Sequence, residues 1–322
     1  MIFITMMFGE KYINSYFDNA LYSICMQKNF EKINKENDSV FLILTTSESE
    51  RFVREGMRRL GDWASKCKFE VRSFNVGEQD DVYFKRTLPL VMLRYAITYC
   101  LNSNKEFFLL CPDTVYSSNV LEYSVDQYKL TGKIVSIFNG KSTLKFSDTK
   151  EIRNSLSKRR GIVDLYINNW TDHVNLLVME EANPENIIID DHAIIQKENY
   201  ISIYTSNPNP TYGKFEMQDL LFFEKAQTFE AWDHFWKDRL AEQHRLFVQT
   251  NLELGMSLEL EDSTSTISGE RAMQAWLERQ KSVEIVRGIS NQFLETPRAL
   301  SDYRKHGFGN RLSMVNFSAR LD

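Results

Sequence analysis

Glycine, proline, cysteine and histidine are all sparse in this sequence. Its 322 residues include only 13 glycines, 6 prolines, 4 cysteines and 5 histidines. So little glycine and proline excludes collagen-like and low-complexity chains. The cysteines stand far apart, with no CxxC pair and no histidine at zinc-binding spacing, which argues against a zinc module and favours reduced thiols in or near the core. These cysteines are Cys25, Cys67, Cys100 and Cys111.

Long apolar runs and an excess of positive charge are also lacking. No stretch approaches the ~20 apolar residues that a membrane helix needs, and the first residues show neither the basic region nor the cleavage site of a signal peptide. The net charge of −5 gives no overall attraction for a phosphate backbone. Because the 43% hydrophobic and 26% charged fractions are those of a globular protein, we expect a cytoplasmic globular protein without a transmembrane segment.

Apolar runs alternate with helical patterns through the first 140 residues. The runs cover residues 2–8, 40–44, 69–74, 107–110 and 133–138. Continuous apolar strands separated by helices pair in parallel and are covered by helices on both faces. The pattern predicts an α/β domain in residues 1–225, built on an open, mostly parallel, Rossmann-like sheet.

The remaining third of the chain has a different pattern. Residues 205–213 read as a turn-rich loop, and helical periods follow, with an apolar stripe that includes Trp232 and Trp236. That stripe belongs either to the core or to the seam of a homo-oligomer. We expect residues 226–322 to form a helical C-terminal region ending in a mobile basic tail. Neither GxGxxG nor the P-loop motif occurs.

The stretch FFLLCPDTVYSS places Asp113 directly after an apolar run. In one interpretation Pro-Asp-Thr is a turn, and Asp113 caps a helix that begins near Ser117. In the other, Asp113 lies at the carboxyl end of a parallel strand, where open α/β sheets bind their ligands. It would there hold a divalent cation, Mn²⁺ or Mg²⁺, which takes carboxylate and phosphate oxygens as ligands.

At this point the sequence resembles the N-terminal half of the GT-A-type glycosyltransferases, the nucleotide-diphospho-sugar transferases. The resemblance rests on FGEKYINSYFDNAL, LTTSESERF and LLCPDTVYSS, each following or ending a predicted strand, and it covers about residues 1–140. In that family an apolar strand runs into an aspartate-x-aspartate motif that binds the metal and the donor diphosphate. This chain has Cys111 in place of the first aspartate and keeps the second, Asp113.

The resemblance implies a GT-A sheet, a nucleotide-sugar donor and an acceptor hydroxyl on a glycan, a lipid-linked glycan or modified DNA. It places Phe8, Gly9 and Tyr12 near the donor nucleotide, and Asp113 with Thr114 at the diphosphate. The two aromatic residues are equally compatible with a core on either side of a turn.

Ionisable residues at two further places in the sequence are candidates for functional roles. Arg94 either lines the same crevice, where a cation would favour a diphosphate, or is an exposed helix residue. In IIIDDHAII, Asp191 is a candidate general base and His192 a candidate metal ligand beside Asp113, unless the stretch is a solvated turn between strands.

Two rival functions stay open. A nucleotidyltransferase would use a similar sheet and metal, but the expected glycine-rich basic loop is missing, because MMFGEKYINS has one glycine. A non-catalytic α/β binding or assembly protein would explain the loss of the first aspartate.

Overall fold

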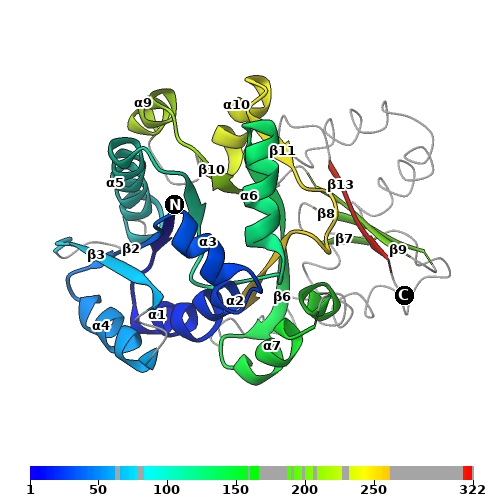
Figure 1. Cartoon of the computed structure of the whole chain (residues 1–322), viewed down its shortest axis with the longest axis horizontal. Helices are drawn as coiled ribbons and strands as arrows, with labels where there is room; N and C mark the ends of the chain where they lie inside the picture. The colour runs from blue at the N-terminus through cyan, green and yellow to red at the C-terminus, as the bar shows by residue number, and fades with distance from the viewer. Residues whose placement is uncertain are drawn as a thin grey trace.

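A computed structural model describes most of the chain, and the account below concerns that part alone. It comprises residues 1–61, 66–77, 83–158, 160–166, 187–189, 192–197, 200–205, 209–226, 232–261 and 315–320. These residues form an α/β structure with a large mixed sheet and a smaller antiparallel sheet beside it (Figure 1).

The large sheet has the strand order β3-β2-β1-β4-β10-β6-β12-β5, and β11 pairs with β6. Its strands are β1 (Ile2–Met6), β2 (Val40–Thr46), β3 (Lys68–Phe74), β4 (Phe107–Leu109), β5 (Thr114–Tyr116), β6 (Ile134–Lys145), β10 (Asn209–Gly213), β11 (Leu246–Val248) and β12 (Met256–Glu261). Each of the five apolar runs found in the sequence lies in one of these strands.

The first four strands pair in parallel, as the sequence predicts. Strand β1 has β2 on one side and β4 on the other, and β3 continues outward from β2. The chain therefore adds β2 and β3 on one side of β1 and then crosses to add β4 on the other side. In open α/β sheets such a switch point leaves a crevice at the carboxyl ends of the two strands.

Strand β10 makes the sheet mixed, which the sequence analysis did not foresee. It runs antiparallel to both β4 and β6, whereas residues 205–213 were expected to be a loop. The misleading signal is Pro210, which lacks a backbone N–H and normally avoids central strands. The strand accommodates it through a register shift between Pro210 and Tyr212.

Helices cover both faces of the sheet. They are α1 (Glu10–Ser15), the π-helix η1 (Tyr16–Ala20), α2 (Leu21–Cys25), α3 (Phe30–Glu36), α4 (Glu50–Arg59), the π-helix η3 (Tyr83–Thr87), α5 (Leu88–Ser103), α6 (Val120–Thr131), α7 (Thr149–Leu156), α9 (Met217–Lys225), the π-helix η4 (Trp232–Trp236) and α10 (Lys237–Glu242). One core contains residues of α1, η1, α2, α3, α4 and α6, a second those of α5, α9, η4 and α10, and a third those of α7 together with β6 and β12.

Alternation along the buried strands supplies the first two cores at once. In β1, Phe3 belongs to the first core, whereas Ile2 and Ile4 belong to the second. Neighbouring residues of a strand point to opposite faces, so a strand covered on both sides must be apolar throughout. This requirement explains the unbroken apolar runs that made the strands recognisable.

The C-terminal third is not uniformly helical, contrary to the sequence-based expectation. Strands β11 and β12 join the large sheet, and β13 (Val315–Arg320) lies where a mobile tail was expected. The prediction of a buried aromatic stripe is confirmed for Trp232 and Trp236, while Phe235 is 63% exposed. Residues 262–314 of the expected helical region lie outside the described residues.

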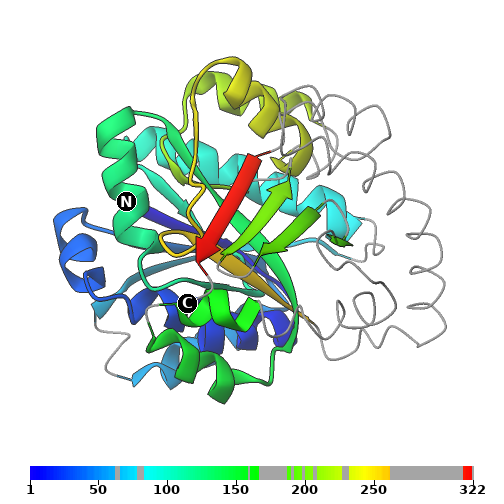
Figure 2. The same ribbon diagram turned by 90° about the vertical axis from the view of Figure 1, so that its right-hand side faces the viewer.

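The smaller sheet has the order β13-β9-β8-β7. Its other strands are β7 (Ile187–Ile189), β8 (His192–Lys197) and β9 (Tyr200–Thr205). Figure 2 shows β13 in red with the other strands of this sheet beside it. Backbone hydrogen bonds of Ser318 with Thr250 and Leu252 join β13 to the segment after β11.

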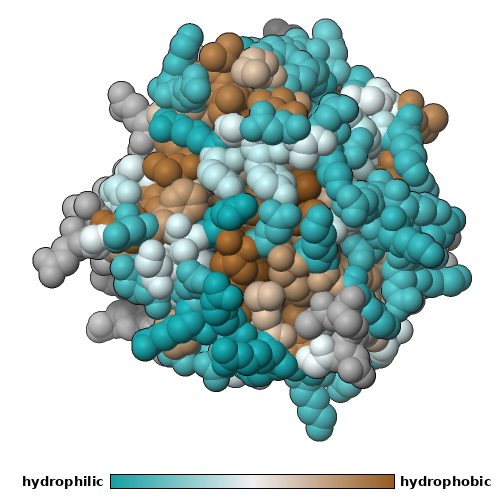
Figure 3. Space-filling model, turned by 60° about the vertical axis from the view of Figure 1, so that its left-hand side comes forward, coloured by the Kyte–Doolittle hydropathy of each residue, from teal (hydrophilic) through white to brown (hydrophobic). Residues whose placement is uncertain are grey.

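Strand β3 is the edge of the large sheet on the side shown in Figure 3, where hydrophilic residues cover most of the face around a central hydrophobic area. It carries the charged residues Lys68, Glu70 and Arg72, of which the two basic ones are exposed. Charges on an edge strand oppose pairing with another sheet. None of the helices in the described ranges is long and apolar enough to cross a membrane.

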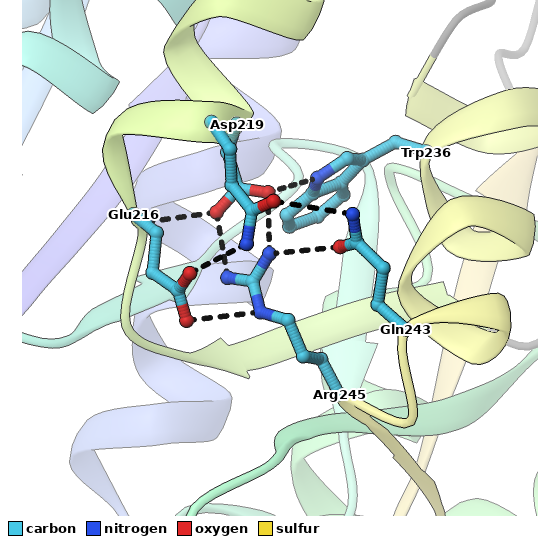
Figure 4. A network of polar contacts seen from close by, with 6 residues as sticks. Glu216, Asp219, Trp236, Gln243 and Arg245 are labelled. Atoms are coloured by element: carbon cyan, nitrogen blue, oxygen red, sulfur yellow. Dashed lines mark hydrogen bonds and ion pairs between the residues drawn. The ribbon is translucent and has the colours of Figure 1, made fainter.

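A buried ionic network fastens helix α9 to the segment before β11 (Figure 4). Arg245 donates two hydrogen bonds to the carboxylate of Asp219, at 2.9 and 2.8 Å. Trp236 donates from its indole nitrogen to the same carboxylate at 2.9 Å, and the backbone N–H of Glu216 donates at 2.8 Å. Because the Asp219 side chain is fully buried, its charge depends on all these donors.

We expect Asp219→Ala to be strongly destabilising. Removing one partner of a buried ion pair costs about 3–5 kcal/mol in the free energy of unfolding, and Arg245 would keep only its ion pair with the more exposed Glu216. Glu31→Ala is the matched control, because its ion pair with Lys66 is exposed and such pairs contribute about 0–1 kcal/mol. Urea unfolding measures both variants, and equal small losses would contradict the assigned importance of this network.

Candidate functional site

The candidate site lies at the carboxyl ends of β1 and β4. The N–H of Leu110, just beyond β4, donates to the carbonyl of Ile4 in β1 at 2.8 Å, so the two strand ends stay side by side. After β1 the chain turns at Gly9, whose φ of 79° is a left-handed conformation that favours glycine. The N–H of Gly9 donates to the hydroxyl of Ser49, which follows β2, at 3.0 Å.

The two aromatic residues on either side of Gly9 differ in environment. Phe8 is partly buried and packs near Phe84, with 5.8 Å between ring centroids. Tyr12, in α1, is 37% exposed and packs edge to face against Phe146 at 5.4 Å. Tyr12 therefore has an open surface that a ligand could contact, whereas Phe8 is largely part of the core.

Asp113 lies in the short turn that joins β4 to β5. The N–H of Thr114 donates to the carbonyl of Cys111 at 3.3 Å and closes the turn. The phenol of Tyr116 braces it by donating to the carbonyl of Leu109 at 3.1 Å and accepting from the N–H of Cys111 at 3.0 Å.

The helix-cap interpretation of Asp113 is wrong. Helix α6 begins at Val120 with Asn119 as its N-cap, and β5 separates Asp113 from that helix. The Asp113 carboxylate instead accepts a 3.3 Å hydrogen bond from the hydroxyl of Thr114, whose side chain is buried. The Asp113 carboxylate thus does not accept a hydrogen bond from the N-terminal backbone N–H groups of α6.

A second acidic residue, Glu259, approaches from β12. Strand β12 pairs antiparallel with β5, and Glu259 stands opposite Thr114. The N–H of Leu260 donates to the carbonyl of Asp113 at 2.7 Å, which fixes β12 against the turn. The side-chain amide of Asn139, in β6, lies 3.5 Å from a carboxylate oxygen of Glu259.

Electrostatics link Tyr12 to both acidic residues. Burial, followed by the negative charges of Asp113 and Glu259, raises the pKa of the Tyr12 phenol above its ordinary value. Burial also raises the pKa of Asp113, although hydrogen bonds from its own backbone and from Thr114 oppose the shift. Both carboxylates therefore lie within electrostatic range of the Tyr12 phenol.

Sequence reasoning missed Glu259. The stretch MSLELE alternates apolar and polar residues, which indicates a half-buried strand. It does not indicate which strand is its neighbour, so nothing in the sequence connected Glu259 with a turn far upstream. The sequence predicted Asp113, Tyr12 and Gly9 correctly as neighbours at one end of the sheet.

Arg94 is not brought together with these residues. Its guanidinium donates to the backbone carbonyls of Phe223 and Ala226 at 2.9 and 2.8 Å, and to that of Glu224 at 3.3 Å. These carbonyls belong to the C-terminal end of α9, where a cation also interacts favourably with the helix dipole. Arg94 therefore fastens α5 to α9, and its role at a donor stays a prediction.

The predicted histidine ligand lies in the smaller sheet. Strand β7 ends at Ile189 and β8 begins at His192, with these two residues paired in an antiparallel ladder. Asp191 itself lies outside the described residues, so its catalytic role remains a prediction. His192 opens β8 in the smaller sheet, and its part in binding a metal likewise remains a prediction.

Metal binding by this site would have to involve a ligand as well as the protein. No group of three or more histidine, cysteine or acidic side chains is arranged to hold a metal in the described part of the chain. The carboxylates of Asp113 and Glu259 are hard oxygen donors, and Mg²⁺ is often held by one or two carboxylates together with substrate phosphates. The two carboxylates could therefore supply the protein's share of the ligands, with phosphates of a bound substrate supplying others.

Comparison with known proteins identifies no relative: no protein-family model matches the chain, and no curated protein matches it.

We expect Asp113→Asn to change how stability depends on pH. Burial raises the pKa of Asp113, so the native state prefers the neutral acid, and its stability falls as the pH rises through that pKa. Asparagine stays neutral. The variant should therefore gain stability relative to the wild type between pH 4 and pH 7, as measured by thermal unfolding.

The control for this exchange is Asp126→Asn, because Asp126 is exposed on α6. An Asp113→Asn protein that is less stable than the wild type by the same amount at every pH would show that the carboxylate is a structural element of the turn.

Proposed function

We propose that the protein is a glycosyltransferase of GT-A type that moves a sugar from a nucleotide-diphosphate donor to a hydroxyl acceptor. The observation that carries the proposal is the position of Asp113. It is a partly buried carboxylate just beyond the carboxyl end of β4, beside the end of β1, and it lies with Glu259 within electrostatic range of Tyr12.

The first half of the large sheet supports the fold part of the proposal. The order β3-β2-β1-β4 with parallel pairing provides a switch point, and nucleotides bind at such points in doubly wound sheets. The site residues occupy the loops at that place. The resemblance of FGEKY and LLCPDTVYSS to GT-A sequences concerns the same two loops.

Charge indicates how a diphosphate would be bound. Two carboxylates repel a diphosphate, so the donor needs a divalent cation between itself and Asp113 and Glu259. In this proposal Glu259 provides the second carboxylate that Cys111 cannot provide from the position of the missing motif aspartate. When bound, the cation would supply stabilisation of the charge that develops on the departing diphosphate.

The reaction would exchange one bond at the anomeric carbon of the sugar. The acceptor oxygen bonds to this carbon, the bond from the carbon to the phosphate oxygen breaks, and the diphosphate leaves with the electron pair. The acceptor proton passes to a base, for which Asp191 is the sequence-based candidate. Tyr12, with its exposed ring edge and its position after Gly9, is placed to contact the nucleotide of the donor.

We expect uridine or guanosine diphosphate to raise the melting temperature only when Mn²⁺ is present. A ligand that binds the folded state alone stabilises it by about 2.7 kcal/mol at 100 times its Kd. Asp113→Asn and Glu259→Gln should lose this shift, because each removes one carboxylate from the cation. Asp126→Asn, exposed on α6, should retain it.

The rival functions give different melting results. Stabilisation by triphosphates and not by diphosphates would favour a nucleotidyltransferase. The absence of any response to nucleotides in the wild type would favour a non-catalytic binding or assembly protein and would contradict the proposal. A shift without Mn²⁺ that survives both substitutions would place the nucleotide away from Asp113.

For the acceptor, glycans and lipid-linked glycans are preferred over modified DNA because of the net negative charge. Hydrolysis or transfer of labelled sugar from the donor identified by melting is the direct assay of activity.

A further inference from the structure

A polar hollow of about 610 Å³ lies beside helix α7, outside the site described above. Its walls come from α7, from the turn before this helix and from residues 157–166 after it. We name it the α7 hollow. The side chains that line it include Lys150, Glu151, Asn154, Ser155, Lys158 and Asp164.

Helix α7 turns its polar face toward the hollow because its apolar face is held by the core. The four lining residues that α7 contributes are spaced i, i+1, i+4 and i+5, which places them on one side of a helix. Ile152, on the other side, is fully buried in the third core, and Leu156 packs against the same core. The orientation of the polar face is therefore fixed by packing.

A glycine allows the two walls of the hollow to approach each other closely. A Cβ atom on Gly161 would lie only 1.7 Å from the carbonyl oxygen of Ser155 in α7, so no other residue fits there without a shift of the backbone. Ile162 and Tyr166 hold the second wall, because both are buried in the third core with Ile152. The α7 hollow is thus formed between two packed segments.

Many polar groups of the lining have no partner within the protein. The side chains of Lys150, Glu151, Asn154, Lys158 and Asp164 make no hydrogen bond or ion pair with any residue that the structure describes. The two ammonium groups and the amide can donate hydrogen bonds, whereas the two carboxylates and the amide oxygen can accept them. The hollow therefore suits a ligand that carries many donors and acceptors of its own.

The charges of the lining argue against a polyanionic ligand. The carboxylates of Asp148, Glu151 and Asp164 outnumber the ammonium groups of Lys150 and Lys158 by three to two, which gives a formal charge of −1. A surface of this charge has no net attraction for a phosphate backbone or for an anionic lipid headgroup.

The lining also argues against a lipid chain. Leu165 is the one apolar side chain among the lining residues, and only 4% of its surface is exposed. An apolar chain bound there would gain little from the removal of apolar surface from water. An uncharged saccharide, with hydroxyl groups that both donate and accept hydrogen bonds, satisfies the charge and the polarity of the hollow together.

Phe146 connects the α7 hollow with the candidate donor site. Its ring packs edge to face against Tyr12, with 5.4 Å between ring centroids, and the next residue, Ser147, lines the hollow. The side-chain amide of Asn19 donates to the carbonyl of Phe146 at 3.1 Å and so fixes this residue to η1. A ligand of several sugar units in the hollow could therefore extend past Phe146 to Tyr12.

We propose that the α7 hollow binds the acceptor of the transfer reaction and that this acceptor is an uncharged oligosaccharide. The role as acceptor rests on the proposed glycosyltransferase function, whereas binding of a saccharide in the hollow does not require it. Lys150 and Asn154 contact hydroxyl groups of the bound saccharide.

The test measures binding of the full-length protein to an array of immobilised uncharged oligosaccharides, with sulfated oligosaccharides and duplex DNA as anionic probes. We expect binding to uncharged oligosaccharides, weakened about tenfold when Lys150→Ala and Asn154→Ala are combined, because hydrogen bonds to the ligand are lost. The matched control combines Lys129→Ala on α6 with Asn102→Ala on α5. All four side chains are exposed, so both double variants should keep the melting temperature of the wild type.

Hydrogen exchange of the wild type gives a second measurement that needs no variant. An oligosaccharide that binds on the array should slow amide exchange in peptides from residues 147–165 and leave α5 and α6 unchanged.

Three results would overturn the inference: no binding of the wild type to uncharged oligosaccharides, preferential binding to the anionic probes, or undiminished binding by the Lys150→Ala and Asn154→Ala variant. The nucleotide melting experiment separates this failure from failure of the proposed function. A nucleotide shift without saccharide binding would contradict the assignment of the hollow alone. Saccharide binding in the hollow without a nucleotide shift would support the saccharide site and contradict the transferase.

Discussion

The fold depends on one constraint: β1 is bonded to parallel neighbours along both edges and buried on both faces. It pairs with β2 along Ile2–Met6 and with β4 along Ile2–Ile4, and its residues supply two of the hydrophobic cores. Helices must therefore cover both sides of the sheet. Parallel pairing also brings the carboxyl ends of β1 and β4 to the same edge, where the loops after them form the candidate site.

The candidate site contains a carboxylate whose ionised form is disfavoured by its surroundings. Asp113 is partly buried with a raised pKa in a turn that is otherwise satisfied by backbone bonds and by the phenol of Tyr116. The Asp219 network shows the opposite arrangement, in which four donors surround one carboxylate. The carboxylate of Asp113 has fewer donors than that of Asp219, and this difference supports the proposed role in ligand binding.

Much of the N-terminal sheet could be predicted because its signals are local. Strands that are covered on both faces are largely apolar, so the runs at 2–8, 40–44 and 107–110 lie close to the observed bounds of β1, β2 and β4. The same logic placed Asp113 and Tyr12 at one sheet edge. Strand β10 was not predicted, because proline is typical of loops. The register shift that accommodates Pro210 in the strand cannot be inferred from residue types alone.

The partner of Asp113 could not be predicted for a different reason. Glu259 reaches the site through pairing of β12 with β5 and β6, strands more than a hundred residues upstream. Such pairing depends on the packing of the whole sheet, which periodicity does not reveal.

The pairing of β12 also sets an order of assembly. During synthesis, β1 to β4 and their covering helices emerge from the ribosome long before residue 259. Strand β5, which follows the Asp113 turn, pairs only with β12. The turn therefore gains its strand partner and Glu259 in the same step, when β12 docks after most of the polypeptide has been made.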